Sequence, residues 1–342
     1  MPEISIPLAI EYAIYAVAIA GSLFAWILLG RWYSRTGQIL PFEPRRAVPW
    51  TAIDLVLILM AQLLLGLLVM RIMQQRFDIS GVPEIANLAR PELLTLLWLS
   101  IGASILTVLF AVALVALRCN ADRDDLGLNT KELRADLRRG VIAFVLIATL
   151  VYALQAGLFH LYPTPHPFID LLRKQPDNEL FLVIFVSVVI VAPICEEILF
   201  RVLLQGWLES AMSETSIRQP AAVDGAEMAA ETDETERRPQ PTGRLRPINS
   251  TNPYAASQVN AAINPAAYIV QPLELSRRFA PVLISSIVFA LAHFGHGPAP
   301  IPLFFLACAL GYLYQQTHRI WPSLVVHTLL NLCSLAILWA EL

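Results

Sequence analysis

The sequence has little charge. Asp, Glu, Lys and Arg make up 15% of its 342 residues, whereas an ordinary soluble protein has about 25%. Apolar residues make up 56% of the chain. This balance excludes a soluble globular enzyme, and it excludes disorder for most of the chain, because disorder requires low hydrophobicity and high charge. The net charge of −3 gives no reason to expect nucleic acid as a partner.

The sequence also has few cysteines and none in a paired motif. The four are Cys119, Cys195, Cys308 and Cys333. None forms a CxxC pair and three lie in apolar runs, so we expect small buried hydrophobic residues rather than disulfides or a structural zinc site. No basic segment precedes the first apolar run, which is too long for a signal peptide, so we expect it to remain as a membrane span.

The sequence is rich in long apolar runs. A helix that crosses the hydrocarbon core needs about 20 apolar residues. Eight segments approach this length, and the sixth and seventh are short enough to tilt or to lie inside a bundle. They are residues 11–30, 52–70, 94–117, 141–162, 180–208, 280–293, 303–317 and 321–340. The predicted fold is all-α: a polytopic membrane helix bundle with about eight transmembrane helices.

Basic residues between the runs predict the orientation. With the N-terminus outside, the inward loops carry 18 Lys and Arg residues and the outward loops carry five. Without the long fifth loop the bias is still 11 to five. Inward loops are rich in Lys and Arg, so we expect a multi-pass protein with both termini outside, in the plasma (inner) membrane if the source is bacterial.

Residues 213–278 differ from the rest, because they are rich in Ala, Glu, Asp, Pro, Asn and Gln and poor in apolar residues. Such a segment buries too little surface to offset its ordering entropy. We expect a disordered cytoplasmic insertion, a flexible linker rather than a regulatory element. The predicted domains are helices 1–3 in residues 1–120 and a core in residues 121–342 that this insertion interrupts.

Ionisable residues interrupt the apolar runs at three places, where each costs roughly 3 kcal/mol on insertion scales. The first is Glu196-Glu197-Ile198-Leu199-Phe200-Arg201. Glu197 and Arg201 are four residues apart and share a helix face. Glu196 is about 100° away, so we expect Glu197 to pair with Arg201 and Glu196 to face a cavity. A salt bridge at the end of the span is the structural alternative.

The second and third places each carry a histidine. Phe289-Ala290-Leu291-Ala292-His293 ends the sixth run, and His296 follows in a turn. His327-Thr328-Leu329-Leu330-Asn331 lies in the last run, with His327 and Asn331 on one helix face. Taken singly, each is explained by hydrogen bonding within a core or between helices.

Together these groups suit the activation of water. A carboxylate serves as general base, a histidine positions the water, and His or Asn donors stabilise an oxyanion. Alternatively, Glu196, His293 and His327 ligate a divalent metal such as Zn²⁺ whose bound water is the nucleophile. No HExxH motif is present, which excludes an ordinary zincin.

In these three motifs, EExxxR, FxxxH and HxxxN, the sequence resembles the CAAX protease and bacteriocin-processing (CPBP, or Abi) family of intramembrane endopeptidases. Leu310-Gly311-Tyr312 through Trp321-Pro322-Ser323, and Asp125-Leu126-Gly127-Leu128, are also similar to it. The resemblance covers roughly residues 122–342 without the insertion.

The resemblance implies a CAAX prenyl protease-like hydrolase that cleaves a membrane-associated or lipid-anchored peptide within the bilayer. It implies that Glu196 and His293 act on the water and that His327 and Asn331 complete the site. Glu197, Arg201 and Phe289 would support them. The alternatives are a non-catalytic immunity factor or scaffold, and a proton-coupled transporter; no repeated half of the sequence favours transport.

The orientation can be tested with reporter fusions at Ser5, Gly225 and Leu342. We expect external signals at Ser5 and Leu342 and a cytoplasmic signal at Gly225, because the basic loops stay inside. A cytoplasmic signal at Leu342 together with an external one at Gly225 would contradict this orientation.

Overall fold

The computed structural model describes residues 6–77, 88–162, 178–213, 269–270, 278–295 and 297–340. Within these ranges the chain is almost entirely helical, and six helices are long and apolar enough to cross a membrane. The helices are α1 (Ile6–Thr36), α2 (Ala52–Phe77), α3 (Arg90–Cys119), α4 (Leu133–Leu161), the segments α6 to α8 of one long helix between Asn178 and Met212, α10 (Ala280–Ala292), α11 (Pro300–Thr317) and α12 (Trp321–Ala340). The predicted all-α membrane bundle is confirmed.

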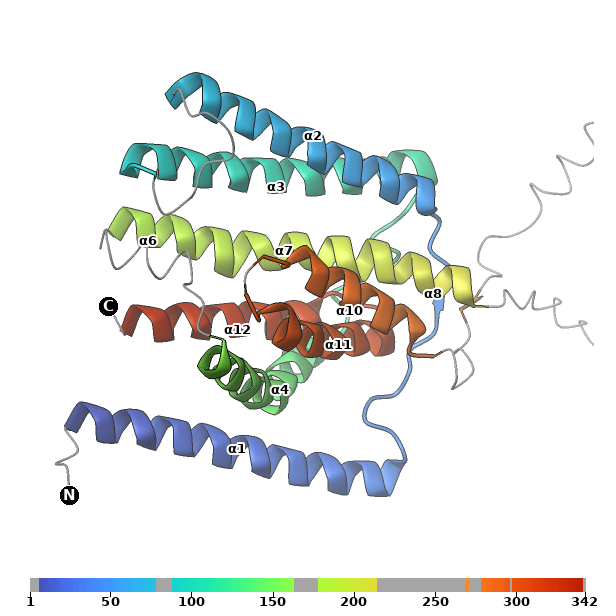
Figure 1. Ribbon diagram of the computed structural model, residues 1–342. Coiled ribbons are helices and arrows are strands. Elements are labelled where there is room, and N and C mark those ends of the chain that lie inside the picture. The colour runs from blue at the N-terminus through green and yellow to red at the C-terminus, as the bar shows by residue number, and fades with distance from the viewer. Residues whose placement is uncertain are drawn as a thin grey trace, which may run out of the picture.

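The helices form one bundle with both termini at the same end (Figure 1). Helix α12 packs against α4, α10 packs against α11, and α2 packs against α3, while α1 lies along α4. Helix α11 is buried along most of its length, which fits the expectation that a short apolar run lies inside the bundle. Pro residues occupy the start of both α10 and α11, where a missing backbone N–H costs nothing.

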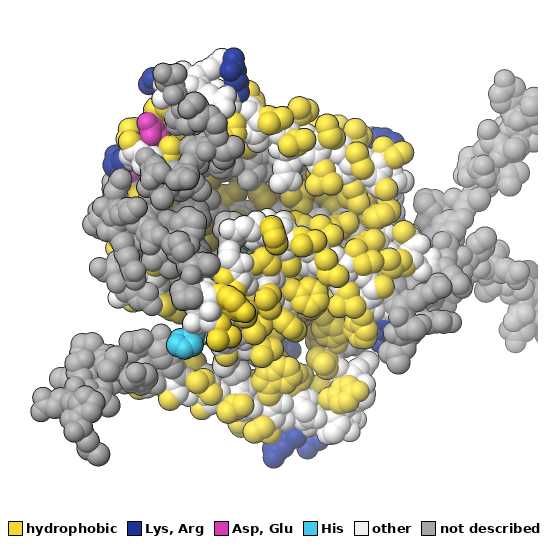
Figure 2. All heavy atoms as spheres, in the orientation of Figure 1, with side chains coloured by type: hydrophobic (Ala, Val, Ile, Leu, Met, Phe, Trp, Pro, Cys, Tyr) yellow, Lys and Arg dark blue, Asp and Glu magenta, His cyan; other side chains and the backbone are white. Residues whose placement is uncertain are grey.

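Hydrophobic side chains cover the outside of the bundle. Figure 2 shows them spread over the middle of the face in view, with Lys and Arg towards its margins. Exposed Leu, Ile, Val and Phe side chains are numerous on α2, α3 and α10. A surface this apolar is stable only against lipid, so the chain is an integral membrane protein.

The long helix contains two π-helical segments. It consists of α6 (Asn178–Phe185), the π-helix η2 (Val186–Val191), α7 (Ala192–Glu196), the π-helix η3 (Glu197–Gln205) and α8 (Gly206–Met212). In a π-helix each bond spans five residues rather than four. Pro193, which lacks a backbone N–H, is the second residue of α7, which follows η2. The apolar run at residues 180–208 predicted a helix here but not its two π segments.

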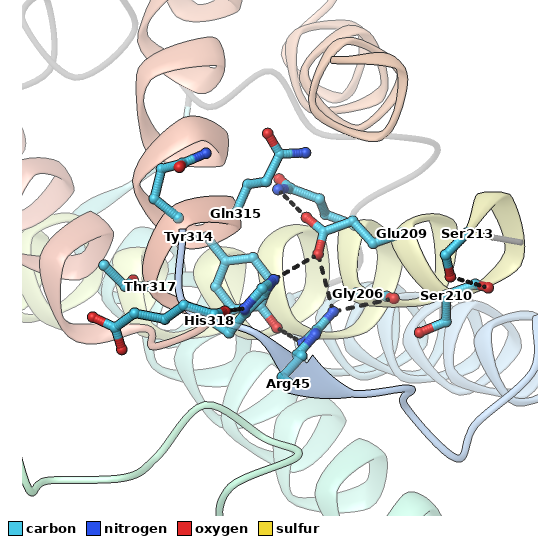
Figure 3. Close-up of polar contacts among 12 residues, drawn as sticks. Arg45, Gly206, Glu209, Ser210, Ser213, Tyr314, Gln315, Thr317 and His318 are labelled. Atoms are coloured by element: carbon cyan, nitrogen blue, oxygen red, sulfur yellow. Dashed lines mark hydrogen bonds and ion pairs between the residues drawn. The ribbon is translucent and has the colours of Figure 1, made fainter. Parts of the chain in front are cut away.

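The segment between α1 and α2 ties the N-terminal helices to the C-terminal half. We call residues 43–50 the interhelical strap. Its Arg45 side chain donates to Tyr314 Oη at 2.8 Å, to Gly206 O at 3.3 Å and to Glu209 Oε2 at 3.2 Å (Figure 3). His318, at the end of α11, contacts the other side of Glu209, with Nε2 3.2 Å from Oε2. The strap therefore holds α8 and α11 together at one end of the bundle.

A two-stranded ladder joins the strap to a distant part of the sequence. Strand β1 (Arg45–Arg46) pairs antiparallel with β2 (Ile269–Val270). Strand β2 lies within the segment expected to be a disordered insertion, near its end. The rest of that prediction, for residues 214–268 and 271–277, lies outside the described residues.

The α4–α12 contact provides a test of the bundle. A Cβ at Gly140 would lie 2.6 Å from Val325 Cβ and 2.8 Å from Pro322 O. We expect Gly140→Ala to force the two helices apart at a cost of about 1–3 kcal/mol, which lowers the thermal stability of the detergent-purified protein.

Gly157 is the matched control, because it lies in the same helix and a Cβ there meets nothing within 4 Å. Gly157→Ala should leave the melting temperature unchanged or raise it slightly. Equal melting temperatures for the two variants would contradict this packing.

Candidate active site

The long helix presents the two adjacent carboxylates. Glu196 ends α7 and Glu197 begins η3. Glu197 and Arg201 are both fully buried, and Arg201 Nε lies 3.6 Å from Glu197 Oε2. The expected ion pair is therefore present. Glu196 is more accessible, with 24% of its side chain exposed.

His327 of α12 lies between the two carboxylates. Its Nδ1 is 3.0 Å from Glu197 Oε1, and its Nε2 is 3.6 Å from Glu196 Oε2. We expected Glu196 to lie about 100° from Glu197 around the helix. Both carboxylates nevertheless reach one imidazole, because glutamate side chains are long enough to approach it from adjacent positions.

Phe289 of α10 lies against the charged groups. Its ring centroid is 5.3 Å from Arg201 Cζ, 5.9 Å from the His327 ring and 4.9 Å from the His293 ring. The aromatic face attracts the guanidinium. The ring contacts both histidines, so this fully buried phenylalanine helps to fix where they lie.

His293 follows the last residue of α10 and is half-buried. Its Nδ1 lies 2.9 Å from Phe289 O. Because a carbonyl oxygen can only accept, Nδ1 carries the hydrogen of this bond. His296, which we expected in a turn, lies outside the described residues.

Asn331 follows His327 by one helical turn. Its Nδ2 donates to Val188 O of η2 at 2.8 Å. The side chain therefore connects α12 to the long helix just before Pro193. This contact leaves the second hydrogen of the amide available in principle to another acceptor.

The donor set does not form a metal-binding group. Within the part of the chain that the structure describes, no three His, Cys, Asp or Glu side chains are arranged to hold a metal ion. Glu196, His293 and His327 are thus not grouped as a three-ligand metal site.

Ser285 is a site residue that the sequence reading missed. Its hydroxyl donates to Phe200 O at 2.8 Å and accepts from Arg201 Nη1 at 3.2 Å. A signal existed, because Ser285, Phe289 and His293 recur every four residues on α10 and share one helix face. Serine is common in membrane helices, so its polarity alone did not distinguish it.

Comparison with known proteins supports the motif assignment. The family model "Type II CAAX prenyl endopeptidase Rce1-like" matches residues 178–223 and 267–333. These ranges include all three motifs and the long helix, α10, α11 and most of α12. No curated protein and no solved structure matches the chain. With its three motifs in order on the matched helices, the chain is similar over these two ranges to the Rce1-like family of type II CAAX prenyl endopeptidases.

Proposed function

We propose that the protein hydrolyses a peptide bond of a membrane-associated or lipid-anchored substrate, with Glu196 as the general base for the attacking water. The observation that carries this proposal is the pair of carboxylates on the two nitrogens of His327. Their environments differ: Glu197 is fully buried and paired with Arg201, whereas Glu196 is partly accessible. Two carboxylates in unlike environments are suited to unlike roles.

Glu197 sets the state of His327. A carboxylate can only accept, so His327 Nδ1–H donates to Glu197 Oε1 across 3.0 Å. Nε2 faces Glu196 Oε2 across 3.6 Å, and it can donate there only when it too carries a proton. His327 can therefore donate to an oxyanion only after a second proton has reached Nε2.

Glu196 can supply that proton. In the proposed reaction the carboxylate takes a proton from water as the water oxygen attacks the substrate carbonyl carbon. The proton passes from Glu196 to His327 Nε2, and the resulting imidazolium is stabilised by Glu197. The charged ring stabilises the oxyanion, and the proton finally goes to the leaving amine as the C–N bond breaks. The neutral His293 ring accepts a hydrogen bond from the same water.

The surroundings favour entry of the substrate from the bilayer. Leu291 and Phe294 flank His293 in sequence and are 59% and 81% exposed on the apolar surface. A lipid-anchored peptide can follow this surface to the site, with the scissile bond near the cytoplasmic face. We propose no soluble partner. Asn331 completes the proposed site beside His327, either at the oxyanion or by fixing the helix that carries Glu196.

The two glutamates should respond differently to substitution. We expect Glu196→Gln to lower the single-turnover rate by about 10²–10⁴ with little loss of protein, because the shape is retained. Glu197→Gln should also lower the melting temperature, because breaking a buried ion pair costs about 3–5 kcal/mol. The readouts are cleavage of a lipid-modified peptide and thermal unfolding in detergent.

Arg90→Gln is the control, because its ion pair with Glu179 is exposed at the helix ends and lies outside the three motifs. It should change neither readout appreciably. A stable, inactive Glu197→Gln beside an active Glu196→Gln would reverse the two roles. Full activity in both, with His293→Ala also active, would favour a non-catalytic scaffold.

A further inference from the structure

Four backbone carbonyls on or next to the π segments receive hydrogen bonds from side chains of other elements. The distances lie between 2.8 and 3.3 Å. The four bonds are Asn331 Nδ2 to Val188 O, Ser285 Oγ to Phe200 O, Trp50 Nε1 to Leu203 O, and Arg45 Nη2 to Gly206 O. The donors come from α12, α10 and, twice, the interhelical strap.

Pro193 explains the first of these bonds. The N–H of Ala192 donates to Ser187 O, five residues back. The next bond of that series would join the N–H of residue 193 to Val188 O, but proline has no N–H. Asn331 supplies the missing donor to Val188 O. A buried carbonyl without a partner is costly, so the side chain stabilises the π form of η2.

Side chains also donate to backbone carbonyls at the end of η3. The Gly206 N–H is directed at Arg201 O and Leu203 O and not at Val202 O, the partner it would have in an α-helix. Where a π turn meets an α turn, the regular series of amide partners is interrupted, and inserted side chains can complete it. Trp50, which is 2% exposed, and Arg45 reach this junction (Figure 3 shows Arg45 beside Gly206).

We infer that Ser285, Trp50 and Arg45 are positioning residues that hold η3 in its π-helical register and so set where Glu197 and Arg201, both within η3, lie relative to His327. Trp50 and Arg45 lie outside the residues matched by the family model. The strap thereby gives the N-terminal part of the chain a role in the site. The expected effect on catalysis rests on the proposed function, whereas the expected effect on the helix rests on backbone geometry alone.

Two matched pairs of variants of the full chain test it. Ser285→Ala removes a donor to η3, whereas Ser286→Ala removes an equally buried hydroxyl for which the described residues show no hydrogen bond to η3. Trp50→Phe removes an indole bond to η3, whereas Trp321→Phe removes an indole bond of similar length to Asn129 O, away from η3. The readouts are amide hydrogen exchange of residues 197–206 and single-turnover cleavage with kcat and KM resolved.

We expect Ser285→Ala and Trp50→Phe to speed exchange in residues 197–206 by about two- to tenfold, the effect of losing one hydrogen bond, and to lower kcat with KM unchanged. The two controls should leave this exchange and kcat as in the wild type. Equal exchange within either pair, or faster exchange with an unchanged kcat, would overturn the inference. The exchange comparison does not need cleavage. If the wild-type protein cleaves no peptide, the proposed function is contradicted, and hydrogen exchange alone still tests whether these residues hold the π-helical register.

Discussion

The buried Glu197 carboxylate is the constraint on which the site depends. A charge in a dry, apolar bundle is tolerated only when it is paired and hydrogen-bonded. Arg201 supplies the opposite charge from the same helix, and His327 supplies a hydrogen bond from α12. The ion pair holds Glu197 in place on the long helix, and the bond to His327 ties that helix to α12 beside Glu196. Glu196 is positioned because Glu197, the next residue of the same helix, is held by these contacts.

The π segments connect this constraint to the rest of the fold. Backbone carbonyls in these segments accept hydrogen bonds from α10, α12 and the interhelical strap. The strap also carries Arg45 into the Glu209 and His318 cluster at the end of the bundle. The interhelical strap, which lies outside the residues matched by the family model, is thus bonded to the helix that carries the site.

The sequence predicted the fold well because lipid imposes a simple rule on composition. All eight apolar runs became helices, and the short run at 303–317 became the buried α11. It also singled out candidate residues that the structure brings together, since charges in apolar runs are costly. It could not predict that Glu196 and Glu197 both reach His327, or that Ser285 and Trp50 bond to η3, because those contacts join distant segments. The domain division and the membrane orientation stay predictions.

The central claim is that Glu196 acts on water as a base and forms no bond to the substrate. Single-turnover cleavage in water enriched in ¹⁸O tests this directly, with mass spectrometry of the product and of the protein peptide that contains Glu196. The account predicts one ¹⁸O atom in the new carboxylate of the product and none in Glu196. Label in the Glu196 side chain would show an acyl intermediate on that residue and would contradict the claim.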